Sequence, residues 1–111
     1  MEDLELVSFQ IISAVGMAKS SYVEAMRAAA AGDAARSEEK MKEGDRHYAQ
    51  GHDAHMDLIT KEANGEGVTP TVILMHAEDQ MMAAETVRLM AEENIRLYQR
   101  LQALEAKTDT A

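Results

Sequence analysis

The 111-residue sequence contains no cysteine and no tryptophan, and it has one proline, one phenylalanine and three tyrosines. The absence of cysteine excludes a disulfide framework, a zinc finger and a thiol nucleophile. Aromatic residues make up 4% of the chain, and aromatic side chains normally supply much of the buried area of a core. Much of the 46% hydrophobic content is alanine and methionine. We therefore expect either a marginal monomer or a core that copies of the chain share.

Basic charge is also scarce, with 11 Lys and Arg against 20 Asp and Glu and a net charge of −9. This balance argues against binding to nucleic acid backbones or anionic membranes. The acidic start, Met1-Glu2-Asp3, lacks the basic residues of a secretory signal. The longest uncharged run, from Leu6 to Ala18, is too short to span a bilayer. We therefore expect one cytoplasmic domain over residues 1–111.

The scarcity of proline and of β-branched clusters favours helix nearly throughout, and two breaks divide the chain. Gly32-Asp33 suits a helix end followed by the N-cap of the next helix. Residues 64–67, Asn-Gly-Glu-Gly, end a second helix, and Thr69-Pro70 then supplies an N-cap and a first helical residue. We predict an all-α, antiparallel three-helix bundle with helices at about residues 3–31, 33–63 and 70–106.

Two glycines, Gly44 and Gly51, lie within the second predicted helix, seven residues apart and so nearly on one face. Each costs a helix up to about 1 kcal/mol relative to alanine. Two interpretations stay open at this point. The glycines either allow a neighbouring helix to approach closely, or they mark a weak place in a helix that faces solvent.

The third predicted helix has two apolar faces rather than one. Residues on the first face follow a 3/4 spacing: Val72, His76, Asp79, Ala83, Thr86, Met90, Leu97, Leu101 and Leu104. The second face consists of Ile73, Ala77, Ala84, Val87, Ala91, Ile95 and Tyr98. A helix with two apolar faces has two partners. One partner is its own hairpin, and the other is most simply a second copy of the chain, packed in parallel about a symmetry axis.

His76 and Asp79 lie one turn apart on the first face, among apolar residues. A buried carboxylate is costly unless it is paired, hydrogen-bonded or bound to a cation. In a symmetric oligomer Asp79 recurs around the axis, so the converging carboxylates need a cation such as Mg²⁺, or protonation. The alternative is that Asp79 lies in water at the edge of the face. A histidine here can fill a core, bind a metal, or act as a base or nucleophile, and spacing does not choose.

The other three histidines, His47, His52 and His55, fall on the second predicted helix. His52 and His55 are one turn apart with acidic residues nearby, which leaves a metal pair open as an alternative to solvated side chains. The glutamate-x-x-histidine pairs of a di-iron bundle are absent. The sequence also contains no glycine-rich phosphate loop.

Residues 72–82, VILMHAEDQMM, resemble the active-site signature of the lactose/cellobiose (and diacetylchitobiose) type enzyme IIA proteins of the bacterial sugar phosphotransferase system. The usual pattern there is an aliphatic run, then histidine, alanine or glycine, glutamine, aspartate, histidine, an aliphatic residue and methionine. Residues 11–20, IISAVGMAKS, are similar to the family's first helix. Gly32-Asp33 matches its first break, and residues 52–65 are like the end of its second helix. The resemblance covers nearly the whole chain.

The resemblance implies a three-helix subunit that assembles into a homotrimer of nine helices. It implies that His76 accepts a phosphoryl group from the phosphocarrier protein HPr and passes it to a cysteine of the cognate IIB protein. It also implies that Asp79 binds a metal ion, usually magnesium, with one ion per trimer on the symmetry axis. Imidazole suits the carrier role because its neutral nitrogen attacks phosphorus near pH 7 and the N–P bond stays labile.

The chain departs from the family's usual pattern at three places. Glu78 stands where glutamine is usual, Gln80 stands where histidine is usual, and His55-Met56 replaces a glutamine-threonine pair. Glu78 lies about 200° round the helix from His76, so its charge faces another way. We expect the IIA component for a β-linked disaccharide or chito-oligosaccharide. The alternative function is an acidic helical interaction or regulatory module without phosphotransfer, in which His76 is packed.

Overall fold

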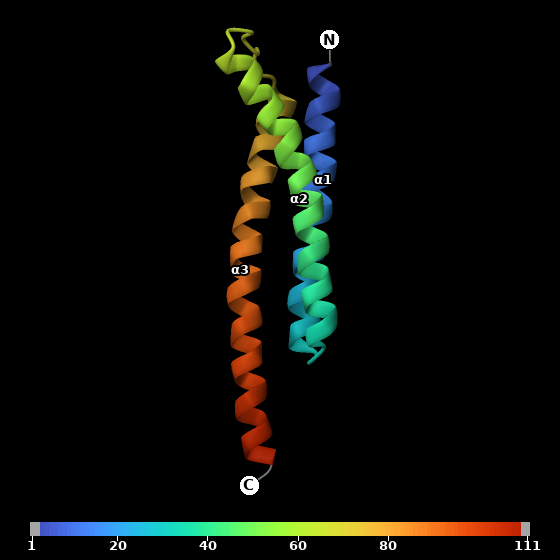
Figure 1. Cartoon of the computed structure of the whole chain (residues 1–111), viewed down its shortest axis with the longest axis vertical. Coiled ribbons are helices and arrows are strands. Elements are labelled where there is room, and N and C mark those ends of the chain that lie inside the picture. Colours follow the sequence, from blue (N-terminus) through green and yellow to red (C-terminus); the bar gives the residue numbers. More distant parts are fainter. Residues whose placement is uncertain (1–2, 110–111) are drawn as a thin grey trace.

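The computed structural model describes residues 3–109, which form three α-helices joined by two short connections (Figure 1). The helices are α1 (Leu4–Ala30), α2 (Ala34–Ala63) and α3 (Val72–Asp109). α1 and α2 form an antiparallel hairpin, and α3 returns alongside α1 and continues past the end of that hairpin (Figure 1). The bundle measures 67 × 21 × 17 Å. The predicted all-α subunit of three helices is confirmed. None of these helices has the apolar length that crossing a bilayer needs.

Local capping sets the ends of the helices. The carboxylates of Asp3 and Asp33 each accept a hydrogen bond from a backbone amide of the following turn, both at 3.1 Å. This is the ordinary arrangement of an N-cap. Gly32 and Gly65 have φ values of +82° and +86°, the left-handed conformation that ends a helix. Both predicted breaks are confirmed.

The third helix begins later than the sequence predicts. The hydroxyl of Thr71, rather than that of Thr69, accepts a hydrogen bond from the backbone amide of Leu74 at 3.1 Å. Pro70 therefore precedes the cap instead of occupying the first helical position. Both threonines have side chains that suit an N-cap, so composition alone does not rank them. The later start places His76 in the second turn of α3.

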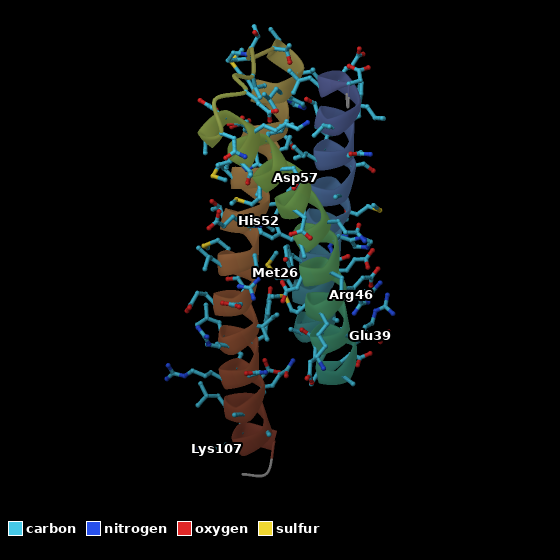
Figure 2. All side chains as sticks on the ribbon, turned by 45° about the horizontal axis from the view of Figure 1, so that its top comes forward. Met26, Glu39, Arg46, His52, Asp57 and Lys107 are labelled. Atoms are coloured by element: carbon cyan, nitrogen blue, oxygen red, sulfur yellow. The ribbon has the colours of Figure 1, made fainter. Side chains whose placement is uncertain are left out.

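The core lies along α1, which packs against both other helices, while α2 and α3 touch each other less. Most of the buried side chains are small, among them Ala14, Ala18, Ala25, Ala77, Ala84 and Ala91. The larger side chains that are almost fully buried are Ile11, Val15, Tyr22 and Met81. Met26 lies between α1 and α3 (Figure 2), where its sulfur accepts a hydrogen bond from Asn94 at 3.2 Å. Alanine lets helices approach closely but buries little area, so the subunit core is thin.

The two glycines of α2 mark its closest approach to α1. A Cβ atom at Gly44 would lie 2.5 Å from Cε1 of Tyr22, and one at Gly51 would lie 2.8 Å from Cγ1 of Val15. Both distances are far shorter than the separation of about 3.5–4.0 Å at which carbon atoms attract. The close-approach interpretation is confirmed, and the weak-place interpretation is wrong.

The first apolar face of α3 lies on the outside of the subunit. Its large side chains and their neighbours are 49–80% exposed: Val72, Met75, Met82, Leu89, Met90, Leu97, Leu101 and Leu104. The second face, with Ala77, Ala84 and Ala91 fully buried, packs within the chain as predicted. An exposed apolar strip of this length is typical of a protein interface.

Candidate functional site

His76 lies in the second turn of α3 with its side chain exposed at the surface of the subunit. The adjacent Ala77 is fully buried in the core that α1 and α3 share, so this turn is held firmly while His76 faces outward. Within residues 3–109 no hydrogen bond or ion pair engages either ring nitrogen of His76. The core-filler interpretation of His76 is wrong for this subunit. Both nitrogens are open to another molecule.

Asp79 lies one turn further along α3, also exposed, between two exposed methionines. Met75 is 56% exposed and Met82 is 51% exposed, and both neighbour Asp79 on the helix surface. The carboxylate of Asp79 forms no hydrogen bond or ion pair within the described chain. In the single subunit Asp79 is exposed to water, which agrees with the interpretation that places it in water and not in a buried site. Its burial depends on a second chain covering this face.

A cation from α1 reaches the same end of α3. Nζ of Lys19 donates a hydrogen bond to Oε1 of Gln80 at 3.3 Å. Gln80 follows His76 by four residues, and residues four apart lie on the same face of a helix. Sequence reasoning missed Lys19 as a site residue, because the contact joins positions 61 residues apart. Its place inside the stretch that resembles the family's first helix was the one available signal.

Glu78 turns away from His76, as its position on the helix predicts. Its Oε1 lies 3.8 Å from Nε2 of His55 on α2. The side chain of His55 is 17% exposed and that of Glu78 is 51% exposed. Two of the three departures from the family's usual pattern therefore face each other across α2 and α3, and the charge of Glu78 is directed at α2.

The histidines of α2 do not assemble a metal site. Within residues 3–109 no three His, Asp or Glu side chains are placed to hold a metal ion. The exposed His52 (Figure 2) lies beside Tyr48, with 6.1 Å between ring centroids. His47 lies 4.0 Å from Glu43, and His55 faces α3. Among the described residues, the pair of His52 and His55 therefore has no third ligand.

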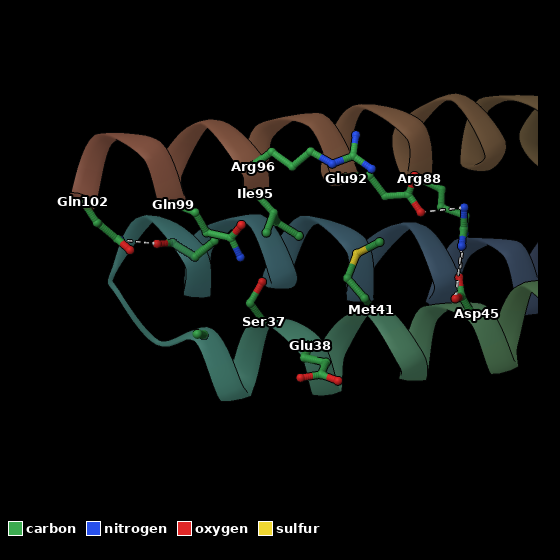
Figure 3. A pocket seen from close by; sticks show the side chains of 12 residues that line it. Ser37, Glu38, Met41, Asp45, Arg88, Glu92, Ile95, Arg96, Gln99 and Gln102 are labelled. Carbon is green, nitrogen blue, oxygen red and sulfur yellow. Dashed lines mark hydrogen bonds and ion pairs between the residues drawn. The ribbon is translucent and has the colours of Figure 1, made fainter. Parts of the chain in front are cut away.

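A groove of about 450 Å³ lies between α2 and α3 (Figure 3). On α3 it is lined by residues from Arg88 onward, three or more turns after His76. Arg88 crosses it, with Nε donating to Oδ1 of Asp45 at 2.8 Å and Nη1 lying 2.9 Å from Oε1 of Glu92. The hydroxyl of Tyr22 donates to the same oxygen of Asp45 at 2.7 Å. Because Tyr22, Asp45 and Arg88 satisfy one another, they form a polar cluster that joins the helices, and these three side chains are not free to bind a ligand.

Asp45 and Arg88 of this polar cluster are both charged at neutral pH. Burial raises the pKa of the Tyr22 phenol, and the Asp45 carboxylate raises it further. Burial works against the charge on Asp45, yet hydrogen bonds from Arg88 and Tyr22 hold the pKa of that carboxyl below its usual value. The hydrogen bond to Asp45 also raises the pKa of the Arg88 guanidinium. Asp45 and Arg88 therefore act as an ion pair that ties α2 to α3.

Comparisons in sequence place the chain among sugar phosphotransferase proteins. Residues 6–99 match the family described as PTS system, lactose/cellobiose specific IIA subunit. The lichenan-specific phosphotransferase enzyme IIA component of Bacillus subtilis is 38% identical over 100 residues, which cover 90% of this chain and 91% of that protein. The PTS system lactose-specific EIIA component of Staphylococcus aureus is 32% identical over 99 residues, covering 89% and 96%.

The fold is also similar to that of a solved structure. The crystal structure of the PTS cellobiose-specific enzyme IIA from Bacillus anthracis superposes with a TM-score of 0.87 at 36% sequence identity. The superposition covers 93% of this chain and 95% of that one. At this identity and coverage, the likeness extends to the sequence as well as the helical arrangement.

Proposed function

The chain belongs to the lactose/cellobiose-specific IIA subunit family of the sugar phosphotransferase system, and we propose that it carries a phosphoryl group on His76. IIA components of these systems are phosphorylated by HPr and work with a cognate IIB protein. The observation that carries the proposal is the imidazole of His76, which is exposed on a firmly held turn with both nitrogens unengaged within the described chain.

The proposed transfer needs no co-reactant besides the two partner proteins. A neutral ring nitrogen of His76 attacks phosphorus in line, and the bond from phosphorus to the donor breaks, with its electron pair leaving on the donor. The other ring nitrogen of His76 releases its proton to the leaving group or to water. In the onward step a IIB thiolate attacks phosphorus, the N–P bond breaks, and the imidazole regains a proton. Such transfers depend mainly on positioning and on stabilising charge.

The sugar of the system is proposed from the relatives. Their names specify lichenan, lactose and cellobiose. We propose that this chain serves the uptake and phosphorylation of a β-linked disaccharide. His76 requires no contact with sugar, because its proposed exchange is with HPr and IIB alone.

We further propose that the chain acts as a homotrimer of nine helices. The support is the exposed apolar face of α3, which no part of the chain from residue 3 to residue 109 covers. On this face Met90, Leu97 and Leu104 repeat every seven residues, the spacing of helices that pack in parallel around an axis. Three copies of α3 would bury these side chains together and supply the core that the alanine-rich subunit lacks.

The trimer would give Asp79 a role as a metal ligand. Three copies of this carboxylate, unpaired within each described chain, would converge on an apolar axis, where burial and mutual repulsion oppose their charges. A cation relieves both costs, and carboxylate oxygens are the ligands that Mg²⁺ prefers. Asp79 therefore fits one Mg²⁺ per trimer, whose positive charge would neutralise the three carboxylates.

Phosphoryl labelling tests the carrier function. With enzyme I, HPr and ³²P-labelled phosphoenolpyruvate, the wild-type chain should acquire an acid-labile label because phosphohistidine is labile in acid. His76→Ala should acquire none. His52→Ala is the matched control, since it removes another exposed histidine from the same subunit, and it should label as the wild type does. An unlabelled wild type, or label that persists in His76→Ala, contradicts the proposal.

A further inference from the structure

We propose that Lys19 is a catalytic residue, whose ammonium binds the phosphoryl group while it is transferred to and from His76. The inference rests on the carrier function proposed above and adds a group from another helix to its site. It follows from one contact between α1 and α3, from the charges around that contact, and from the direction in which helical side chains lean.

The geometry places the ammonium of Lys19 against Gln80, one helical turn after His76. Nζ of Lys19 lies 3.3 Å from Oε1 of Gln80. Side chains of an α-helix lean toward its N-terminus, so the amide of Gln80 covers the turn before it, which contains His76. Side chains four residues apart have Cβ atoms about 6 Å from each other. The half-buried stem of Lys19 thus delivers a positive charge to the face on which the imidazole lies.

The charge on Lys19 is not neutralised within the described chain. No ion pair joins it to a carboxylate among residues 3–109, and its hydrogen bond is to a neutral amide oxygen. Lys40 shows the contrast, since its ammonium lies 2.9 Å from Glu24 and 3.0 Å from Glu43. A phosphoryl oxygen carries negative charge and forms a stronger hydrogen bond with an ammonium than an amide does. The phosphoryl group can therefore displace Gln80 from Lys19.

The site needs such a cation. A phosphoryl group on His76 brings negative charge to a chain with a net charge of −9, one turn from the carboxylate of Asp79. Charge that develops during transfer is stabilised best by a donor that is already in place. Gln80 supplies that preorganisation because its amide oxygen holds the ammonium near His76 without pairing it to a carboxylate. Gln80 stands where the family's usual pattern has histidine, and in this proposal its function is to hold the ammonium of Lys19 in place.

Three variants test the proposal by single-turnover transfer from phosphorylated HPr at saturating donor. Lys19→Gln keeps a hydrogen-bond donor at this position but has no charge, so its rate should fall about 10-fold or more. Lys19→Arg retains the charge and should stay within about 3-fold of the wild type. Lys42→Gln, the control, removes a cation that is paired with Glu38 on the exposed side of α2, and its rate should not change.

Each other outcome overturns the proposal. A wild-type rate in Lys19→Gln shows that the charge of Lys19 does not speed phosphoryl transfer. Equal losses in Lys19→Gln and Lys19→Arg, with lowered melting temperatures, show a packing role. A raised KM for phosphorylated HPr with an unchanged rate at saturation shows that Lys19 only docks the partner. A wild-type chain that never accepts a phosphoryl group overturns the carrier function itself, which the labelling of His76 reports independently.

Discussion

At the scale of single residues, Gly44 shows how a missing side chain sets the distance between two helices. A Cβ there would lie 2.5, 2.7 and 3.0 Å from three ring carbons of Tyr22. The ring is fully buried, and its hydroxyl donates a hydrogen bond to Asp45, so a Cβ at position 44 would force the ring or a helix to shift. The ring of Tyr22 and the glycine therefore form one packing unit.

We predict that Gly44→Ala lowers the free energy of unfolding. Overpacking a core typically costs about 1–3 kcal/mol, whereas the gain in helix propensity from glycine to alanine is up to about 1 kcal/mol. The net loss should be about 1–2 kcal/mol, measured by urea denaturation. Gly16→Ala on α1 is the matched control, because a Cβ there meets nothing within 4 Å. It should gain about 0.5–1 kcal/mol, and an equal gain in Gly44→Ala would contradict the close approach.

At the scale of helices, two polar pairs join α2 to α3. The pairs Asp45–Arg88 and His55–Glu78 both cross between these helices, which touch each other less than either touches α1. The side chains of Arg88 and Asp45 are 35% and 45% exposed. Solvent therefore screens the pair, and its contribution lies below the range of about 1.5–3 kcal/mol for hydrogen bonds to charged groups.

We predict that Asp45→Asn costs about 1 kcal/mol of stability at pH 7. The pKa of Asp45 is lower in the folded chain than its usual 3.8, so the carboxylate stabilises the fold above that value. The contribution is lost as the pH falls through the folded-state pKa, where Asp45 becomes protonated. Thermal unfolding should therefore show wild type and variant converging as the pH falls below 3.8 and then through the lower folded-state pKa of Asp45.

A control separates this pair from surface charge in general. Glu38→Gln removes the partner of Lys42 in a pair whose side chains are 72% and 68% exposed. It should change stability at pH 7 by less than about 0.5 kcal/mol. A difference between wild type and Asp45→Asn that persists unchanged into acid would contradict the role assigned to the carboxylate.

At the scale of the whole molecule, the apolar outer face of α3 and the thin alanine core both bear on the proposed association of subunits. The buried side chains are mostly small and the outer face of α3 is apolar and exposed, which are the two features that support the proposed association. The proposed trimer also decides the environment of Asp79, which is exposed in a single chain and would be buried in three.

We predict that Asp79→Leu remains trimeric and loses its bound metal, because leucine removes the buried charges together with the ligands. Leu97→Glu should dissociate the trimer, because it places a charge from each chain in the apolar seam. Size-exclusion chromatography with light scattering and elemental analysis measure both. Glu39→Lys, on an exposed position of α2, is the control and should change neither. A monomeric wild type, or unchanged metal content in Asp79→Leu, would contradict this prediction.

Particular residues show how far the sequence could predict this structure. The breaks at Gly32 and Gly65 and the inward face of Ala77, Ala84 and Ala91 were predicted, because each depends on neighbours within one or two turns. The cap of α3 was placed at Thr69 instead of Thr71, since the two differ only in context. The contact of Lys19 with Gln80 was not predicted at all.

The sequence by itself determined which parts of the chain form helices, where α1 and α2 end, and which faces are apolar, because helical periodicity and capping are local. It also placed His76 and Asp79 on a common face. Only the tertiary structure decided which distant side chains meet. The contacts of Lys19 with Gln80 and of Asp45 with Arg88 join positions 61 and 43 residues apart. They depend on the rotation and shift of each helix, which close packing at Gly44, Gly51 and the core alanines sets.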